Sequence, residues 1–335
     1  MTNLQDFAES DELRRQLRNL QVKVRDAKEH RQELIDAVYT ASRDALAALG
    51  PVLPVAPPPP DRRKKPEVAL IHATDWQRGK RTQSYNSEIC DERVNRLADK
   101  IFTLTKIARS DHPVNSAAVL FGGDMLEGVN IFPGQTFEID SWLYDQFFGL
   151  IRLEERFIRR LLSEFETVEI WAEPGNHGRI GRSKSGDFPA ADNMDNLSYG
   201  VAKMLLENEP RVIWHPYHSW YQPVQIGNYK AMLIHGDEIK SFGGNTPAFG
   251  LLRKGTAWSS GVVEEGFQDI YFGHFHTPMT LTLPNGGQMY GTGSTESSNA
   301  YAAEFVAAKG KPSQRLHFIE PEKGHVTAEY RLWLD

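Results

Sequence analysis

Cysteine is almost absent from this chain, which has Cys90 as its one thiol in 335 residues. A single thiol excludes a disulfide within the chain and a zinc site built from thiolates. The sequence also lacks an apolar run near the ~20 residues needed to cross a bilayer, and its first residues are polar and acidic, unlike a targeting peptide. We therefore expect a soluble protein of a reducing compartment, the cytoplasm.

An excess of positive charge is missing as well. The chain has 38 Lys and Arg against 44 Asp and Glu, which gives a net charge of −6. A protein of this charge does not attract nucleic acid over its whole surface, so any surface that binds phosphates must be local. With 40% hydrophobic residues the chain can bury a core, as one large domain or as two.

Glycine and proline are absent between about Asp11 and Leu49. In this stretch apolar residues recur at alternating spacings of three and four, with Arg31 as a polar break, over about five heptads. The seam consists of Leu13, Leu17, Leu20, Val24, Ala27, Leu34, Val38, Ala41, Ala45 and Ala48. The pattern predicts a helical arm over residues 1–50. Two interpretations stay open, a coiled coil that makes the protein a homo-oligomer and one amphipathic helix packed on its own domain.

A proline-rich stretch over residues 51–66 follows the helix-ending Gly50. It contains four successive prolines, Pro57 to Pro60, and a basic cluster from Arg62 to Lys65. Such a composition is typical of a semi-rigid linker. The basic cluster could contact nucleic acid or could simply be solvated. We predict a domain boundary here, with a second domain over residues 67–335.

Strand and helix patterns alternate beyond the linker. We expect strands at 68–72, 117–121 and 168–172, helices at 88–110, 141–166 and 193–209, and further strands at 212–214, 229–234, 270–272, 316–319 and 326–332. An early βαβαβ order followed by many strands predicts an α/β fold with more sheet than a doubly wound fold needs.

Polar side chains follow five of these strands directly. They are Asp75 and Gln77, Asp124 and Glu127, Asn176 and His177, His235, and His274 and His276. Ligands of α/β sheets bind beyond the carboxyl ends of the strands, so we expect these groups to converge on one site. Carboxylate, amide and imidazole groups without sulfur suit divalent ions such as Mn, Fe, Zn or Mg. Their number suits two ions, ~3.5–4 Å apart, as used for displacement at phosphorus.

The ordered motifs Asp75-x-Gln77, Gly123-Asp124, Gly175-Asn176-His177, His235 and Gly273-His274-x-His276 resemble those of calcineurin-like metallophosphoesterases. The resemblance covers roughly residues 68–296. It implies a four-layer α/β/β/α sandwich that hydrolyses phosphate esters by a hydroxide bridging two metal ions.

The resemblance also implies a role for each residue of the motifs. Asp75, Asp124 and His276 would hold one ion, with Gln77 beside them. Asp124, Asn176, His235 and His274 would hold the other, so that Asp124 bridges the two. The ions are expected to be Mn, with Fe, Zn, Ni or Mg as alternatives. His177 would be the general acid that protonates the leaving oxygen, and Glu127 would orient it.

The first motif departs from the family pattern, because Gln77 stands where a histidine is usual. An amide oxygen is a poorer ligand than imidazole, so this ion is expected to bind more weakly. An Asp-Trp-Gln motif resembles that of phage-encoded relatives. The second motif lacks the arginine of the protein Ser/Thr phosphatase branch. The resemblance therefore favours the phosphodiesterase and nuclease branch, which includes Mre11/SbcD-like exonucleases.

Basic residues flank two of the motifs. Arg78, Lys80 and Arg81 follow the first motif, and Arg179, Arg182 and Lys184 follow the third. We expect them to bind phosphates of a DNA or RNA substrate, although ordinary solvation of loops would give the same pattern. The sequence therefore predicts a di-metal phosphodiesterase acting on nucleic acid. The alternatives are a phosphomonoesterase or small-nucleotide phosphodiesterase, and a scaffold that acts through its coiled coil.

Overall fold

The computed structural model describes residues 53–129, 131–180, 192–239, 247–296 and 311–335, together with Glu33, Asp36, Ala37, Thr40 and Asp44. The chain divides into two compact units, Met1–Val52 and Leu53–Asp335. The five described positions of the first unit are helical and exposed. The rest of the predicted arm lies outside the described residues, so the coiled coil stays a prediction.

The first sheet of the second unit has six strands, four of them parallel. Its order is β11 (His325–Trp333), β10 (Ser313–Glu320), β1 (Val68–Ala73), β2 (Ser116–Phe121), β3 (Thr167–Ala172) and β4 (Val212–Trp214). Strands β1 to β4 are parallel, and β10 and β11 are added antiparallel at one edge. The strands predicted from the sequence in this sheet are all present.

The second sheet has five strands and is also mixed. Its order is β5 (Gln222–Ile226), β6 (Tyr229–Leu233), β7 (Asp269–Phe272), β9 (Gln288–Gly291) and β8 (Met279–Thr282). Strands β6, β7 and β9 are parallel to one another, and β5 and β8 pair antiparallel at the two edges.

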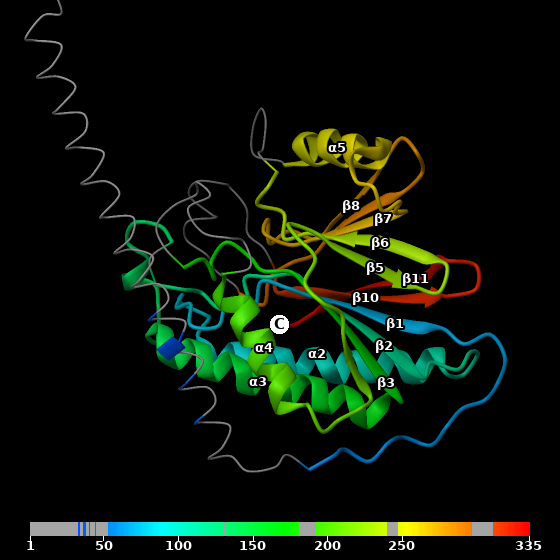
Figure 1. Ribbon diagram of the computed structural model, residues 1–335, viewed down its shortest axis with the longest axis horizontal. Coiled ribbons are helices and arrows are strands. Elements are labelled where there is room, and N and C mark those ends of the chain that lie inside the picture. Colours follow the sequence, from blue (N-terminus) through cyan, green and yellow to red (C-terminus); the bar gives the residue numbers. More distant parts are fainter. Residues whose placement is uncertain are drawn as a thin grey trace, which may run out of the picture. The chain divides into compact units, whose positions relative to one another are not determined.

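The helices lie outside the two sheets. They are α2 (Ser87–Ala108), α3 (Leu143–Glu164), α4 (Met194–Leu205) and α5 (Ala248–Ala257), with a 3₁₀ turn η1 (Gln135–Phe137) and a π-helical turn η2 (Trp258–Val262). Helices α2, α3 and α4 cover the first sheet and α5 covers the second, which gives the order helix, sheet, sheet, helix (Figure 1). The prediction of a mixed α/β fold is confirmed. In the described ranges no helix combines the length and apolarity that a membrane span requires.

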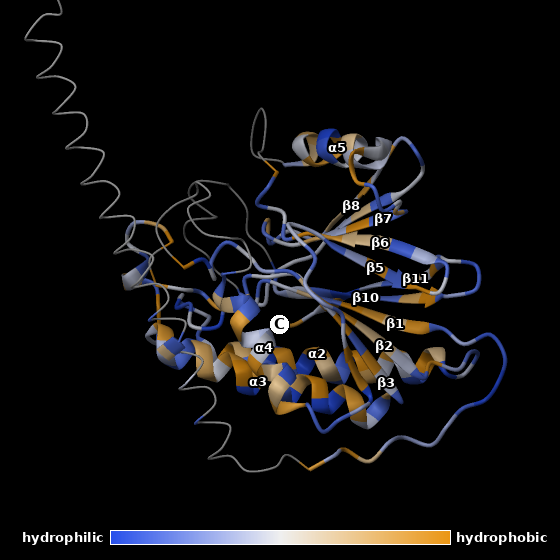
Figure 2. Ribbon diagram, in the orientation of Figure 1, coloured by the Kyte–Doolittle hydropathy of each residue, from blue (hydrophilic) through white to orange (hydrophobic). Residues whose placement is uncertain are grey.

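A hydrophobic core shared by both sheets lies between them. Its buried residues are Leu70, Ala118, Leu120, Trp171, Val224, Ile226, Tyr229, Ala231, Leu233, Tyr271, Tyr290 and Ile319. They come from strands of both sheets. Figure 2 shows the apolar character of β1 and β2 in orange. Strands β1 and β2 are buried on both faces because α2 and α3 cover the other side, which explains their continuous apolar runs.

Four elements were missed from the sequence, β5, β8, β9 and α5. Strand β5 contains Pro223, which is tolerated because β5 lies at the edge of its sheet. Helix α5 contains Gly250 and Gly255, which are poor helix formers. A Cβ on Gly255 would lie 2.5 Å from the sulfur of Met289, so this glycine lets α5 approach the second sheet. Packing therefore overrides local propensity here.

From Leu53 onward the proline-rich segment is part of the second unit. The backbone N–H of Val55 donates to Glu209 at 2.9 Å, and Arg211 donates to the carbonyl of Val55 at 2.6 Å. Asn115 donates to the carbonyl of Asp61 at 2.6 Å. The segment was expected to be a linker without packing partners, but the part from residue 53 is hydrogen-bonded along the helical layer.

We expect Leu120→Ala to destabilise the second unit by about 2–5 kcal/mol, because it leaves a cavity between two closely packed sheets. Leu120 is fully buried in the shared core. Ile107→Ala is the control, since Ile107 is 58% exposed and its truncation should change the free energy of unfolding by less than about 0.5 kcal/mol. Urea unfolding followed by circular dichroism measures both. Equal midpoints for the two variants would contradict this assignment of the core.

Candidate metal centre

The five predicted strand ends meet at one end of the two sheets. Strands β1, β2 and β3 run in one direction in the first sheet, and β6 and β7 are parallel in the second. Their carboxyl ends lie on the left in Figure 1. The loops after β1 and β2 are joined by backbone hydrogen bonds, from Asp75 to Gly123 and from Gln77 to Asp124, both 2.9 Å. The convergence expected from the sequence is therefore present.

The backbone at this site is strained at five non-glycine residues. The left-handed region is rarely populated by residues with a Cβ. Six described non-glycine residues have a positive φ, and all except Lys65 are candidate metal ligands: Asp75 (52°), Gln77 (42°), Asp124 (50°), His274 (62°) and His276 (50°). Strain of this kind persists where a site requires a particular side-chain direction.

Asp124 lies at the centre of the first group of ligands. Its Oδ2 is 3.1 Å from Nε2 of His235, and the same nitrogen is 3.2 Å from Oδ1 of Asn176. Donor atoms of Asp124, His235 and His274 all lie within 4.8 Å of one another. Nδ1 of His235 contacts the carbonyl of Gly122 at 2.7 Å, which leaves Nε2 to face the carboxylate.

Asp75, Gln77 and His276 form the second group. Nε2 of His276 is 3.2 Å from Oδ1 of Asp75 and 3.3 Å from the amide nitrogen of Gln77. The other ring nitrogen of His276 is 2.9 Å from Oε1 of Glu296, which is the carboxylate–histidine arrangement that orients metal-binding imidazoles. The buried Oε1 of Gln77 has no hydrogen-bond partner among the described residues, so an amide oxygen is left for an ion.

The two groups fit divalent cations. They combine carboxylate, imidazole and amide donors, the set that suits Mn, Fe, Zn or Mg. Asp75, Asp124 and His235 are at most 1% exposed, and such a cluster of buried acceptors is unfavourable without a cation among them. The roles of the individual ligands belong to the proposal below.

Asp124 is held by close contacts between two loops. The carboxylate of Asp195, at the start of α4, accepts the backbone N–H groups of Asp124 and Gly175 at 2.9 Å each. Gly123 and Gly175 approach so closely that a Cβ on Gly175 would lie 2.1 Å from Oδ1 of Asp124. The glycines of both motifs are thus required by the contact between the loops as well as by the turns.

His177 lies beside the first group. Its backbone N–H donates to Oδ1 of Asp124 at 2.7 Å, and its Nε2 is 3.9 Å from the other oxygen of the same carboxylate. Its Nδ1 is 2.7 Å from the carbonyl of Glu127 and 3.3 Å from the Glu127 carboxylate. The ring is therefore oriented by Glu127 through both groups, with the carbonyl the nearer partner.

The pKa values show how strongly this site attracts positive charge. Burial lowers the pKa of His177, but the carboxylates of Asp124 and Glu127 outweigh it and raise the pKa to about 9. Burial also lowers the pKa of His276, while the hydrogen bond and charge of Asp75 raise it to about 10. For His274, burial and the charge of His235 outweigh the carboxylates of Asp124, Asp237 and Asp75 and lower the pKa to about 4.

The basic residues expected to bind substrate are only partly at the site. The guanidinium of Arg78 is paired with Asp91 of α2 at 2.9 Å, and its Nη1 lies 2.0 Å from where a Cβ of Gly149 in α3 would be. Arg78 is thus a structural link between helices, which corrects the expectation. Arg179 forms an ion pair with Asp237, two residues after His235. Arg182 and Lys184 lie outside the described residues.

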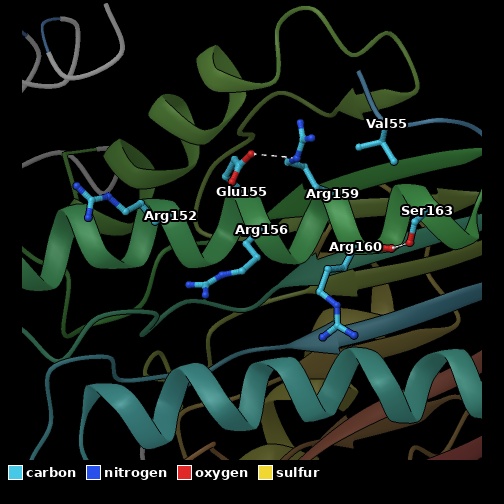
Figure 3. Close-up of a pocket in the computed structure, with 7 residues that line it drawn as sticks. All are labelled: Val55, Arg152, Glu155, Arg156, Arg159, Arg160 and Ser163. Atoms are coloured by element: carbon cyan, nitrogen blue, oxygen red, sulfur yellow. Dashed lines mark hydrogen bonds and ion pairs between the residues drawn. The ribbon is translucent and has the colours of Figure 1, made fainter. Parts of the chain in front are cut away.

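A second cluster of arginines lies on the outer side of α3. A cavity of about 610 Å³ is lined by Val55, Arg152, Glu155, Arg156, Arg159, Arg160 and Ser163 (Figure 3). Three of these arginines are paired: Arg159 with Glu155, Arg160 with Asp99 and Arg156 with Asp91. The pairing leaves little net charge, and the groove lies in the helical layer, so we do not regard it as the functional site.

Sequence reasoning missed three residues that support the site. Glu296 follows β9, a strand that the sequence pattern does not predict. Asp195 lies in the predicted helix 193–209, and the helical pattern gives it no role at the site. Lys80 was expected on the surface but is 3% exposed. The hairpin signal Pro284-Asn-Gly-Gly between β8 and β9 could have revealed the sixth strand end and with it Glu296.

Comparison with known proteins gave similarities of structure alone. No family model matches the sequence, and no curated protein matches it. Vps29 from Entamoeba histolytica, solved with Zn²⁺, has 13% identity over 80% of this chain and 99% of its own, with a TM-score of 0.35. A predicted phosphoesterase from Streptococcus pneumoniae has 12% identity over 80% and 98%, with a TM-score of 0.33. A putative 5'-nucleotidase from Staphylococcus aureus has 10% identity over 80% and 54%, with a TM-score of 0.37.

We expect Mn²⁺ binding to release protons and to tighten as the pH rises. His276 is protonated below its pKa of about 10, so an ion that takes its Nε2 must displace that proton. The affinity should rise roughly tenfold per pH unit for each proton displaced. Titration calorimetry between about pH 6.5 and about pH 8.5, in two buffers of different ionisation enthalpy, counts the protons. An affinity that does not change over this range would contradict the assignment of His276 as a ligand.

Proposed function

We propose that this chain is a di-metal phosphodiesterase, with nucleic acid as its substrate class. The observation that carries the proposal is the convergence of Asp75, Gln77, Asp124, Asn176, His235, His274 and His276 at one end of the sheets, five of them with a left-handed backbone. The ordered motifs and their resemblance to calcineurin-like metallophosphoesterases support the same assignment.

The site would hold one ion between Asp75, Gln77 and His276 and a second between Asn176, His235 and His274, with Asp124 shared. Two divalent ions, Mn²⁺ in our proposal, supply a nucleophile at neutral pH and neutralise charge on the phosphate. Asp124 is our candidate for the shared ligand, because a carboxylate has two oxygens, whereas an imidazole has one nitrogen for each ion, and because its loop is hydrogen-bonded to that of Gln77.

His177 is positioned to act as the general acid. Its Nδ1 is fixed by Glu127, so that Nε2 is the atom that can carry the transferred proton. The raised pKa of about 9 keeps the ring protonated at neutral pH, as a general acid must be. In the proposed reaction His177 delivers this proton to the leaving oxygen.

The charge around the site favours a diester over a monoester. A monoester carries a second negative charge, which cationic side chains beside the ions would stabilise further. Among the described residues near the ligands, Lys80 and Arg179 are already paired with carboxylates. Arg182 and Lys184 of the adjoining segment remain our candidates for contacts with flanking phosphates.

We expect Asp124→Asn to abolish turnover, because an amide cannot supply the negative charge that both ions share. The purified protein with Mn²⁺ is assayed on bis-p-nitrophenyl phosphate, p-nitrophenyl phosphate, and labelled single- and double-stranded DNA and RNA. His112→Ala serves as a control, since His112 lies on the surface beside Asp111. Full activity of Asp124→Asn would sink the two-metal proposal. Turnover of the monoester alone would replace it by a phosphomonoesterase, and no turnover of any substrate would favour the scaffold.

We also propose that residues 11–49 form a coiled coil that makes the protein a homo-oligomer. Replacing Leu17 and Leu34 together by glutamate puts two charges into the apolar seam and should reduce the molar mass to that of one chain. Light scattering after size-exclusion chromatography measures it for the full-length protein. A wild-type molar mass equal to one chain would contradict the coiled coil and leave the amphipathic-helix interpretation.

A further inference from the structure

Lys80 is a buried cation at the edge of the candidate metal centre. It lies on the loop after β1, where its backbone N–H donates to the carbonyl of Gln77 at 3.0 Å and its backbone forms a bridge with Ile139. The residue is only 3% exposed, and its Nζ lies 5.9 Å from the centre of the Phe132 ring. A lysine this buried cannot serve as a surface contact for phosphates, which was its expected role.

The ammonium of Lys80 lies between two carboxylates from different loops. Its Nζ is 3.6 Å from Oε1 of Glu127, after β2, and 3.4 Å from Oε2 of Glu296, after β9. Both glutamates are buried as well. Burial lowers the pKa of Lys80, but Glu127 and Glu296 outweigh it and the net shift is upward, so the group stays charged.

Each of these carboxylates uses its other oxygen to contact a histidine of the site. Oε2 of Glu127 is 3.3 Å from Nδ1 of His177, and Oε1 of Glu296 is 2.9 Å from Nδ1 of His276. The order His177, Glu127, Lys80, Glu296, His276 is therefore continuous. It links the candidate general acid to a candidate metal ligand through one lysine.

We infer that Lys80 is a positioning residue, whose ammonium group holds Glu127 and Glu296 in the geometry that orients His177 and His276. The inference rests on the proposed function and adds a residue to it. Two buried carboxylates without a cation between them would repel each other and move apart. This movement would lengthen the contact of Glu296 with His276 and that of the Glu127 carboxylate with His177, so that the His177 ring would be held by the carbonyl of Glu127 alone.

The test compares Lys80→Met with wild type in two measurements. The Mn²⁺ affinity reports on His276, and partners of this kind cost roughly 10–100-fold when lost. The second measurement compares two diesters, one with an alkyl alcohol and one with p-nitrophenolate as the leaving group. The ratio of their kcat values reports on His177, because only the alkyl alcohol is a poor leaving group that needs protonation. We expect the Mn²⁺ affinity and the leaving-group ratio each to fall at least about tenfold in Lys80→Met. When His177→Ala is already present, adding Lys80→Met should leave the leaving-group ratio unchanged.

Variants of the two glutamates test the contact with His276 and the contact with His177 separately. Glu296→Gln should weaken Mn²⁺ binding with little change in the leaving-group ratio, and Glu127→Gln should do the reverse. These two variants keep the inference testable if Lys80→Met does not fold. Lys80→Arg retains the charge and should recover part of the Mn²⁺ affinity and part of the leaving-group ratio. Arg315→Met is the matched control: Arg315 is 6% exposed and pairs with Glu329, so its loss should lower the melting temperature but leave both measurements unchanged.

The outcomes distinguish this inference from the proposed function. If wild type binds Mn²⁺ and hydrolyses diesters while Lys80→Met equals it in both measurements, the role of Lys80 is overturned and the proposed function stands. The role of Lys80 is also overturned if Arg315→Met lowers the Mn²⁺ affinity and the leaving-group ratio as much as Lys80→Met does, since a general loss of stability would then explain both effects. If wild type neither binds Mn²⁺ nor turns over a diester, the proposed function itself fails.

Discussion

Buried negative charge at one end of the two sheets is the constraint on which the rest of the site depends. Five carboxylates lie there, Asp75, Asp124, Glu127, Asp195 and Glu296, and none is more than 6% exposed. Carboxylates out of water are stable only with cations or with several hydrogen-bond donors nearby. The described structure supplies backbone N–H groups to Asp195, an ammonium to the two glutamates, and protonated imidazoles to Asp75 and Asp124. Divalent ions would take the place of the protons in the last case.

The backbone strain is explained by the same constraint. A left-handed backbone costs a non-glycine residue about 1 kcal/mol or more, and the site contains five such residues. The compact sheets and the contact between Gly123 and Gly175 hold these loops in place. A ligand that binds only the folded state adds about 2.7 kcal/mol when present at a hundred times its dissociation constant. Ion binding of this strength would offset a large part of the strain.

The sequence predicted the fold where the periodicity was long and the local signals agreed. Strands β1, β2 and β3 are continuous apolar runs because both faces of the first sheet are covered, and α2 and α3 have long amphipathic patterns. Of the five strands of the second sheet only β6 and β7 were predicted. Strand β5 contains a proline at an edge, and β8 has no buried residue that would mark it as a strand. Their existence depends on neighbouring strands, which a local pattern does not contain.

The candidate ligands were predictable for a similar reason. Each follows a recognisable strand, and parallel strands bring their ends together whatever the rest of the chain does. The residues that orient the ligands were not predictable in this way. Asp195 contacts Asp124 across 71 positions of sequence. Glu296 contacts His276 from the loop after β9, a strand that was not predicted. Arg78 and Lys80 are neighbours of the same motif, yet one points between two helices and the other into the site. Spacing alone could not separate them.

The overall charge has a consequence for how a phosphodiester would reach the site. The chain has a net charge of −6, and the cations described near the ligands are paired with carboxylates. The bound ions would then be the main positive charge that the described site presents to a phosphate. An anionic substrate would depend on the ions for its attraction to the site, because the other described cations there are already paired with carboxylates. Metal binding would therefore control substrate binding as well as the chemical step. Both would depend on the negative charge of Asp75 and Asp124, which would hold the ions.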